Sequence, residues 1–334
     1  MENENKIFNS LFDVADYIKD YPTIMECFLK ADYVLAKFNN PCCYISGGKD
    51  SDIMLDIISK VDKDKKVQYV WFDTGIEYQA TKDHLNYLEQ RYCISIHREK
   101  AIKAIPTSCR EYGQPFLSKH VSDKMSSLQS HNFQWEDESF DTLIQRYPKC
   151  RSALLWWTNG KANTHQYNIS GNKYLKEFIL QNPPQFKISN KCCNYAKKSV
   201  AHKFEKEHKC DLSIIGVRKA EGGIRATAYK SCFSENEDKI SQYRPVFWFK
   251  EEDKDNYDKL FNIRHSNCYE VYGLKRTGCV GCPYTRDIDK DIAVMEEYEP
   301  KLAKAAQHIF KESYEYTKLY RQFVDNMKTE KKLK

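Results

Sequence analysis

One short segment that joins a buried-strand pattern to a helix pattern constrains this chain more than any other feature. Its sequence is Ser46-Gly47-Gly48-Lys49-Asp50-Ser51. The glycines allow backbone N–H groups to turn inward, where a Cβ would obstruct them. The start of the helix adds partial positive charge, the lysine adds a full charge, and the serine hydroxyls can donate hydrogen bonds. The glycines lack the four-residue spacer of a Walker A loop. The segment nevertheless predicts a loop that binds nucleotide phosphate.

The elements expected around this loop alternate between strand and helix. Strands are expected at 42–45, 67–72, 93–97 and 212–216, and helices at 51–59 and about 78–91. The strand at 67–72 is almost wholly apolar, as in a parallel strand covered on both faces. The alternation therefore predicts a doubly wound, mostly parallel, Rossmann-like α/β sheet that binds ligands at the carboxyl ends of its strands.

The rest of the chain suggests three regions. A helical lead-in is expected over residues 1–39, the nucleotide-binding α/β domain over 40–235, and a cysteine-containing region with charged helices over 236–334. Residues 120–190 show no clear period. We expect them to form either a helical insertion that covers the site or a loosely ordered loop.

Composition favours a cytoplasmic globular protein without a membrane partner. Apolar residues make up 41% of the 334 residues and charged residues 30%, and no apolar run approaches the roughly 18 residues of a membrane span. The polar N-terminus does not resemble a signal peptide. The net charge of +6 permits an anionic substrate. The thirteen cysteines are then expected to be thiols or metal ligands rather than disulfides.

Five of these cysteines suggest a metal centre. They lie in segments far apart in the sequence, and they are Cys192, Cys193, Cys232, Cys279 and Cys282. The last two form a C-x-x-C motif in a glycine-rich stretch. Thiolates in such turns suit an iron–sulfur cluster or zinc. The other eight are expected to be small core residues.

The phosphate-binding segment resembles the PP-loop of ATP pyrophosphatases and of adenylyl- and phosphoadenylyl-sulfate reductases, which carry SGGKDS after their first strand. The resemblance extends over about residues 40–285. It implies that Ser46, Gly47, Gly48, Lys49, Asp50 and Ser51 bind ATP or an adenylyl sulfonucleotide. Lys49 would stabilise the phosphate charge, and Asp50 would help to position Mg²⁺.

Three further segments match the phosphoadenylyl-sulfate reductase family. They are a DTG segment followed by a glutamate, a Gly-x-Arg segment followed by a second arginine, and a G-x-P-x-x-S-K loop. The resemblance thereby adds Asp73, Thr74, Gly75, Glu77, Lys119, Gly216, Arg218 and Arg225 to the nucleotide site. The two arginines would hold one anion together. An ordinary strand-end turn and surface ion pairs are the alternative interpretations of these residues.

The resemblance also implies a [4Fe-4S] cluster, with zinc as the alternative metal. Adenylyl-sulfate reductases carry a Cys-Cys pair and, about eighty residues later, a C-x-x-C motif. This pattern gives Cys192, Cys193, Cys279 and Cys282 as ligands. Many bacterial and prophage members have a lone cysteine after the arginine motif, which gives Cys193, Cys232, Cys279 and Cys282. We favour the second set.

The reaction expected from the resemblance is sulfur transfer. The sulfate reductases attack their substrate with a C-terminal cysteine, but no cysteine follows Cys282. We therefore expect an ATP-pyrophosphatase-type enzyme in which ATP adenylates an acceptor and sulfur displaces AMP. Lys49, Asp50, Arg218 and Arg225 would carry the catalysis.

Relatives of this kind act in DNA phosphorothioation and tRNA thiolation. The resemblance thus implies a sulfur donor, such as a cysteine desulfurase, and a nucleic-acid acceptor as partners. Two alternatives remain at this point. One is a sulfonucleotide reductase that produces sulfite with an atypical or borrowed thiol, and the other is a non-catalytic sensor of nucleotide or redox state.

Overall fold

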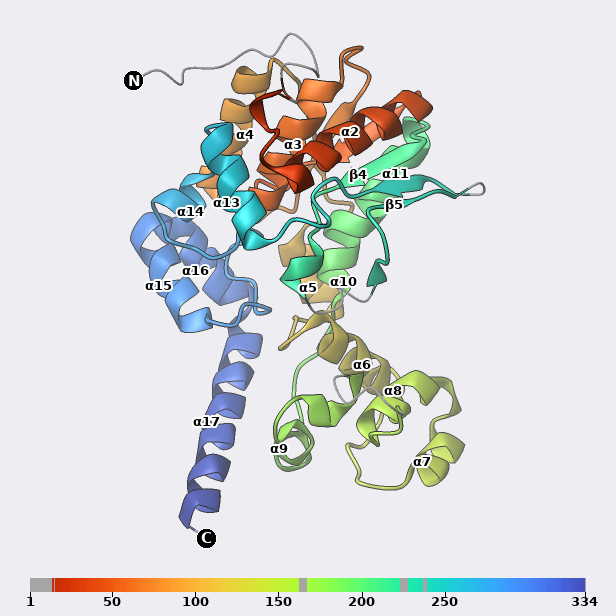
Figure 1. Ribbon diagram of the computed structural model, residues 1–334. Coiled ribbons are helices and arrows are strands. Elements are labelled where there is room, and N and C mark those ends of the chain that lie inside the picture. Colours follow the sequence, from red (N-terminus) through yellow and green to blue (C-terminus); the bar gives the residue numbers. More distant parts are fainter. Residues whose placement is uncertain (1–13, 15, 162–166, 223–227, 237–238, 334) are drawn as a thin grey trace. The chain divides into compact units, whose positions relative to one another are not determined.

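The computed structural model divides the chain into two compact units (Figure 1). It describes residues 14, 16–161, 167–222, 228–236 and 239–333. The first unit comprises Met1–Asp73, Glu77–Lys100 and Ser199–Gly278. The second comprises Thr74–Ile76, Ala101–Lys198 and Cys279–Lys334. Within the described ranges, no helix has the length and apolar character needed to cross a membrane.

The first unit is built on a six-stranded sheet with the order β3-β2-β1-β4-β6-β5. Its strands are β1 (Pro41–Tyr44), β2 (Gln68–Asp73), β3 (Ile96–Lys100), β4 (Leu212–Ile215), β5 (Phe233–Ser234) and β6 (Ser241–Tyr243). All neighbouring pairs are parallel except β5 with β6 at one edge. The predicted doubly wound, mostly parallel α/β fold is confirmed.

Strand β3 begins three residues later than the sequence pattern predicts. The preceding helix α4 (Gln79–Tyr92) ends at Cys93, whose φ of 50° places it in the left-handed region. The N–H of Cys93 donates to the carbonyl of Glu89 and so caps the last turn. Residues 93–95 therefore terminate the helix, and the strand starts only at Ile96.

Helices cover both faces of the sheet. They are α2 (Pro22–Lys37), α3 (Lys49–Val61), α4 and α13 (Glu251–Leu260) on one face and α11 (Ser199–Glu207) on the other. Side chains of β1 alternate accordingly, because successive residues of a strand point to opposite faces. Cys43 belongs to the large core with α2 and α3, whereas Cys42 packs with Phe204 of α11.

The second unit is helical. Its helices are α5 (Ile105–Tyr112), α6 (Lys119–Gln129), α7 (Phe140–Arg146), α8 (Arg151–Trp157), α9 (Leu175–Gln181), α10 (Lys191–Cys193), α15 (Ile288–Tyr298), α16 (Pro300–Ile309) and α17 (Lys311–Leu333). The described part of residues 120–190 is therefore helical, which is one of the two forms expected from the sequence. Phe178 is fully buried in its core, where its ring lies 4.9 Å from Tyr316 and 5.2 Å from Tyr320 of α17.

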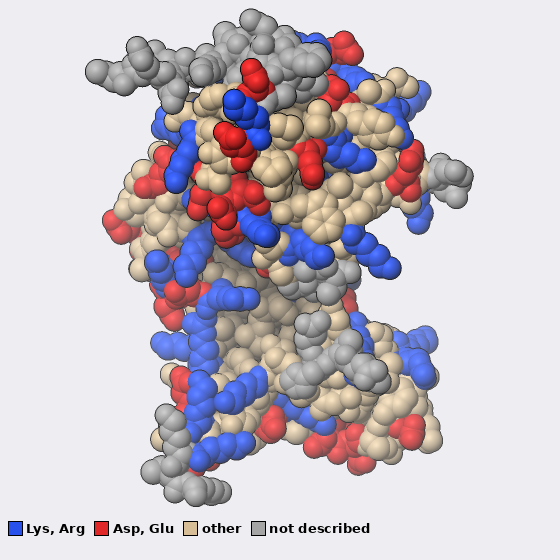
Figure 2. Space-filling view, in the orientation of Figure 1, with Lys and Arg blue, Asp and Glu red and all other residues tan. Residues whose placement is uncertain are grey.

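The displayed surface carries mixed charge. Figure 2 shows Lys and Arg side chains interspersed with Asp and Glu, with basic side chains concentrated along α17. The basic residues of this helix include Lys311, Lys318, Arg321, Lys328 and Lys331. The modest net charge of the chain therefore does not produce one extended basic field on this face.

Replacing Phe178 by Ala is expected to destabilise the second unit by about 3–5 kcal/mol, because it leaves a cavity among aromatic rings. Thermal unfolding of the full chain measures the effect as a lower melting temperature. Leu319→Ala on α17 is the control, since that side chain is 43% exposed. Equal melting temperatures for the two variants would contradict this account of the core.

Candidate nucleotide site and cysteine group

The predicted phosphate loop lies where the strand order of the sheet reverses. From β1 the chain proceeds to β2 and β3 on one side, while β4 and β6 lie on the other side. In open α/β sheets, ligands bind outside the carboxyl ends of the two strands at such a point. The loop between β1 and α3 and the segment after β4 both emerge there.

The loop is shaped by a glycine with positive φ and by its own serines. Gly47 has a φ of 69°, and a Cβ there would lie 2.8 Å from Cγ2 of Thr81. The N–H of Ser46 donates to Oγ of Ser51 at 2.9 Å, and the N–H of Gly48 donates to Oγ of Ser46 at 3.3 Å. Both serine oxygens accept, so their hydroxyl hydrogens can be donated to a ligand.

Helix α3 starts without a side-chain cap. Its N-cap residue is Gly48, which has no side chain to satisfy the first N–H groups of the helix. These donors and the partial positive charge of the helix end suit an anion. The site thus has the local chemistry expected for nucleotide phosphate.

Gly216 permits β4 to approach this helix end closely. A Cβ on Gly216 would lie 3.1 Å from the carbonyl oxygen of Asp50 and 3.1 Å from Cα of Ser51. Both neighbours are backbone atoms, which cannot rotate away. A larger residue would therefore force the strand end and the phosphate loop apart.

Arg218 follows β4 and pairs with the loop. Its Nε donates to Oδ1 of Asp50 at 2.7 Å, and its Nη2 lies 2.8 Å from Oε1 of Glu251. The side chain is buried, and its Nη1 has no hydrogen-bond partner among the described residues. Burial raises the pKa of Asp50, and the hydrogen bond from Arg218 opposes that rise. Nη1 of the guanidinium therefore keeps hydrogen-bond donors that no described residue uses.

Two of the expected roles at this end of the site remain predictions. Asp50 is already paired with Arg218, and its expected contact with Mg²⁺ remains a prediction. Arg225, the second arginine of the expected anion clamp, lies outside the described residues.

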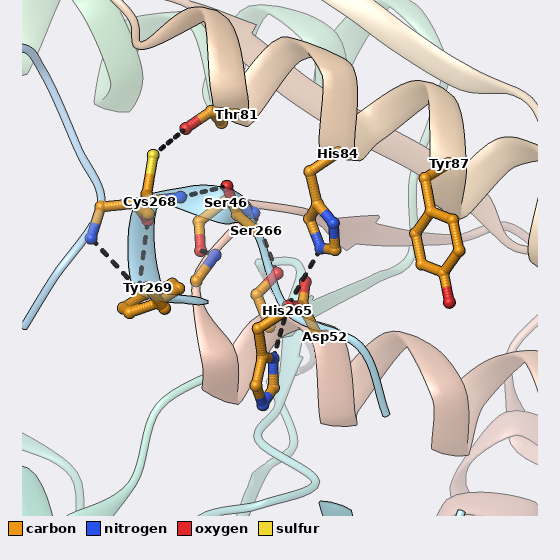
Figure 3. Close-up of polar contacts among 12 residues, drawn as sticks. Ser46, Asp52, Thr81, His84, Tyr87, His265, Ser266, Cys268 and Tyr269 are labelled. Carbon is orange, nitrogen blue, oxygen red and sulfur yellow. Dashed lines mark hydrogen bonds and ion pairs between the residues drawn. The ribbon is translucent and has the colours of Figure 1, made fainter. Parts of the chain in front are cut away.

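A buried charged cluster that sequence analysis missed lies directly behind the loop (Figure 3). Asp52, in the first turn of α3, is fully buried, and its Oδ2 lies 2.8 Å from Nδ1 of His265. Nε2 of His84 lies 3.1 Å from the same oxygen but makes no hydrogen bond there. Nε2 of His265 contacts Asp258 at 3.0 Å. Asp52 and Asp56, two aspartates among the apolar residues of α3, were the only local signal for buried charge here.

Both ring nitrogens of His265 face carboxylates, so the imidazolium form satisfies them best. Burial lowers the pKa of His265, but the hydrogen bonds to Asp258 and Asp52 outweigh burial and raise the pKa to about 9. His265 therefore carries a positive charge between Asp52 and Asp258 at neutral pH.

The DTG segment is divided between the two units. Asp73 ends β2 in the first unit, where Glu77 is also buried. Thr74 and Gly75 belong to the second unit, and Oγ1 of Thr74 lies 3.6 Å from Sγ of Cys279. The expected contacts of these residues with nucleotide remain predictions.

The second unit gathers five thiols. They are Cys109, Cys192, Cys193, Cys279 and Cys282. A hydrogen bond with Cys109 raises the pKa of Cys192, and a hydrogen bond with Cys192 raises the pKa of Cys193. Burial, followed by the nearby Cys279 and Cys193, raises the pKa of Cys282 to about 12. Cys109 was expected to be only a core residue, because nothing near it in the sequence indicates these contacts.

Lys119 lies near this thiol group. It is the first residue of α6, where Ser118 caps the helix by accepting from the N–H of Val121. The positive charges of Lys119 and Lys197 act to lower the pKa of Cys193. The sequence motif assigned Lys119 to the nucleotide phosphates or sulfate, and that role remains a prediction.

Cys232 lies in the first unit, whereas these thiols belong to the second. It neighbours Cys27, whose pKa is raised mainly by burial and further by Cys232. Both line a cavity of about 470 Å³ together with Tyr243. The ligand set that includes Cys232 remains a prediction.

The thiol group fits a metal centre in its chemistry. Among the residues that the structure describes, no group of three or more His, Cys, Asp or Glu side chains is arranged to hold a metal ion. The neighbouring thiols raise the pKa of Cys192 and of Cys193. Thiolates are the ligands of iron–sulfur clusters and of structural zinc, which take four, so four of these five cysteines could supply the donors.

The family comparison agrees with the position of the phosphate loop. Residues 40–132 match the model of the phosphoadenosine phosphosulfate reductase domain. This part of the chain is similar to a phosphoadenosine phosphosulfate (PAPS) reductase domain. It contains the phosphate loop, the DTG segment and Lys119. No curated protein matches the sequence significantly.

Two solved structures are similar to the chain. Phosphoadenylyl-sulfate (PAPS) reductase from Candida auris, in a phosphate complex, is 14% identical, with a TM-score of 0.43 over 82% of this chain and 98% of that protein. U34-tRNA thiolase NcsA from Methanococcus maripaludis, with its [4Fe-4S] cluster, is 13% identical, with a TM-score of 0.35 over 90% of this chain and 80% of that protein. At these values no residue role transfers from either protein.

His265 is expected to make stability depend on pH above neutrality. Its pKa of about 9 exceeds the ordinary value of 6.5, so its contribution of up to about 3 kcal/mol is complete below pH 6.5 and is lost as pH rises through 9. His265→Gln should therefore lower the melting temperature at pH 6 and flatten its fall between pH 7 and 10. The control is His202→Gln, whose side chain is 70% exposed. Parallel pH profiles for wild type and His265→Gln would contradict the assignment.

Proposed function

We propose that this chain is an ATP-pyrophosphatase-type enzyme of sulfur transfer, which binds ATP at the phosphate loop and uses a cysteine-held iron–sulfur cluster. One observation carries the nucleotide part of the proposal. The uncapped start of α3 and the unpartnered Nη1 of Arg218 lie at the same switch point of the sheet. A helix start without a side-chain cap suits a phosphate chain, and so does a guanidinium nitrogen without a hydrogen-bond partner.

The residues of the loop would act on the leaving pyrophosphate. An acceptor oxygen attacks the α-phosphorus of ATP, the bond to the β-phosphate oxygen breaks, and pyrophosphate leaves with the bonding electrons. The N–H groups of α3, Lys49 and Arg218 would stabilise the charge that develops on pyrophosphate. A sulfur nucleophile then displaces AMP from the activated acceptor.

Four thiols of the second unit would hold the cluster. Cys192, Cys193, Cys279 and Cys282 are all in that unit, and their mutual effects on pKa support this set over the one that includes Cys232. When bound, such a cluster would supply a redox-active, sulfur-rich centre in this unit. Lys119 and Lys197 would offset part of its negative charge.

Lys49→Ala is expected to weaken ATP binding at least tenfold and leave the melting temperature unchanged, because the lysine contributes charge at the loop rather than core packing. Isothermal titration calorimetry with ATP measures the affinity. Lys63→Ala is the matched control, since it removes an exposed lysine shortly after the same helix. Equal ATP affinity for both variants would contradict the phosphate-loop assignment.

Product analysis then separates the proposed reaction from its rival. The purified chain is incubated with ATP, adenylyl sulfate or phosphoadenylyl sulfate, the last two with thioredoxin as reductant. Release of sulfite would favour a sulfonucleotide reductase over the proposed sulfur transfer. If the chain binds ATP but shows no turnover with any acceptor tested, a non-catalytic sensor would be favoured.

Protein purified without oxygen is expected to contain about four irons and four sulfides per chain. Cys279→Ser should lose most of this iron, because a hydroxyl is a poorer iron ligand than a thiolate. Cys93→Ser, at an exposed position of the first unit, is the control. Cys232→Ser should retain iron, and loss of iron in that variant would support the other ligand set. One tightly bound zinc in place of iron would contradict the cluster.

A further inference from the structure

A segment more than two hundred residues after the phosphate loop packs against it. This segment runs from His265 to Thr277 and includes the short helix α14 (Asn267–Glu270). It lies outside the residues that match the family model. Three contacts hold the start of this segment against helices α3 and α4 (Figure 3). His265 contacts Asp52 of α3. Ser266 donates to the carbonyl of Ala80 and Cys268 contacts Thr81, both in α4.

These contacts place the hydroxyl of Tyr269 at the start of α3. The backbone N–H of Thr277 donates to this oxygen at 3.1 Å. The ammonium nitrogen of Lys49 lies 5.2 Å from the centre of the Tyr269 ring. Burial raises the pKa of Tyr269, so the phenol remains neutral and keeps its hydrogen.

Three hydroxyls converge beside Gly48. The point that a Cβ of Gly48 would occupy lies 3.2 Å from Oγ of Ser46, 3.4 Å from Oη of Tyr269 and 3.6 Å from Oγ1 of Thr277. Because Gly48 has no side chain, a small space lined by hydroxyl groups remains beside it; this space is called the cradle below. A side chain at position 48 would fill it.

One hydroxyl hydrogen of Tyr269 and Thr277 remains for donation to a ligand. Tyr269 and Thr277 carry one hydroxyl hydrogen each, and their oxygens are 3.3 Å apart. Their mutual hydrogen bond uses one of the two hydrogens. The other can be donated to an anion in the cradle, next to the first N–H groups of α3.

We propose that Tyr269 and Thr277 are phosphate-binding residues, whose hydroxyls complete the loop on the side of Gly48. The inference rests on the proposed nucleotide function and extends it to a part of the chain that the family match does not include. The ligand chemistry is a nucleotide phosphate or inorganic pyrophosphate. Adenosine, which has no phosphate, should not depend on these hydroxyls.

The test compares variants that remove each hydroxyl and keep the shape of the side chain. Tyr269→Phe and Thr277→Val should each bind ATP and inorganic pyrophosphate about tenfold more weakly, as expected when a hydrogen bond to a charged group is lost. Thr277→Ser keeps the hydroxyl and should restore affinity to within about threefold of wild type. Tyr33→Phe is the matched control, because Tyr33 is an exposed tyrosine of α2.

Calorimetry gives the affinities of the full-length chain for ATP, pyrophosphate and adenosine, and thermal melts show that each variant is folded. A purely structural role would lower the melting temperature and weaken adenosine and pyrophosphate binding alike. ATP affinity that is unchanged or higher in both Tyr269→Phe and Thr277→Val, while Lys49→Ala still loses it, would overturn this inference alone. Absence of ATP binding to the wild-type chain would overturn the proposed function and this inference with it.

Discussion

Under the proposed function, the first turn of α3 must stay open to an anion and yet be held in place, and its neighbours in the first unit meet both conditions. Capping this helix with a side chain would stabilise it and at the same time block the anion site. The structure instead fixes the turn from behind and from the side. Gly216 lets β4 press against its backbone, Arg218 pairs with Asp50, and His265 binds Asp52. The hydrogen-bond donors that would face an anion are therefore those of the loop glycines and of the hydroxyl groups.

This arrangement carries an energetic cost. Among the described residues, Oδ1 of Asp52 and Nη1 of Arg218 are buried without hydrogen-bond partners. An unsatisfied buried polar atom costs about 1–3 kcal/mol, and more when the group is charged. Buried polar atoms without partners are found at sites that bind charged ligands. For Arg218 a bound anion would remove the cost, so that binding would stabilise the fold.

Local sequence patterns predict the parts of the site that one segment builds by itself. The phosphate loop could be predicted because its glycines, serines and helix start lie within six residues. The cluster of Asp52 and His265 could not, because these residues are 213 positions apart and neither stands in a motif. Cys109 was missed for the same reason, and β3 was placed early because nothing local indicates that Cys93 caps a helix with a left-handed residue. Contacts between distant segments depend on the register of the whole sheet.

The chain enters and leaves each unit several times. Residues 74–76 and 101–198 belong to the second unit, the stretches on either side of them belong to the first, and the chain returns to the second unit after Gly278. Neither unit is therefore a continuous fragment that could be expressed by itself or exchanged as a module between relatives. A truncation after Gly278 would remove two thiols of the cysteine group and leave the other three. The roles of the phosphate loop and of the thiols can for this reason be separated only by point substitutions.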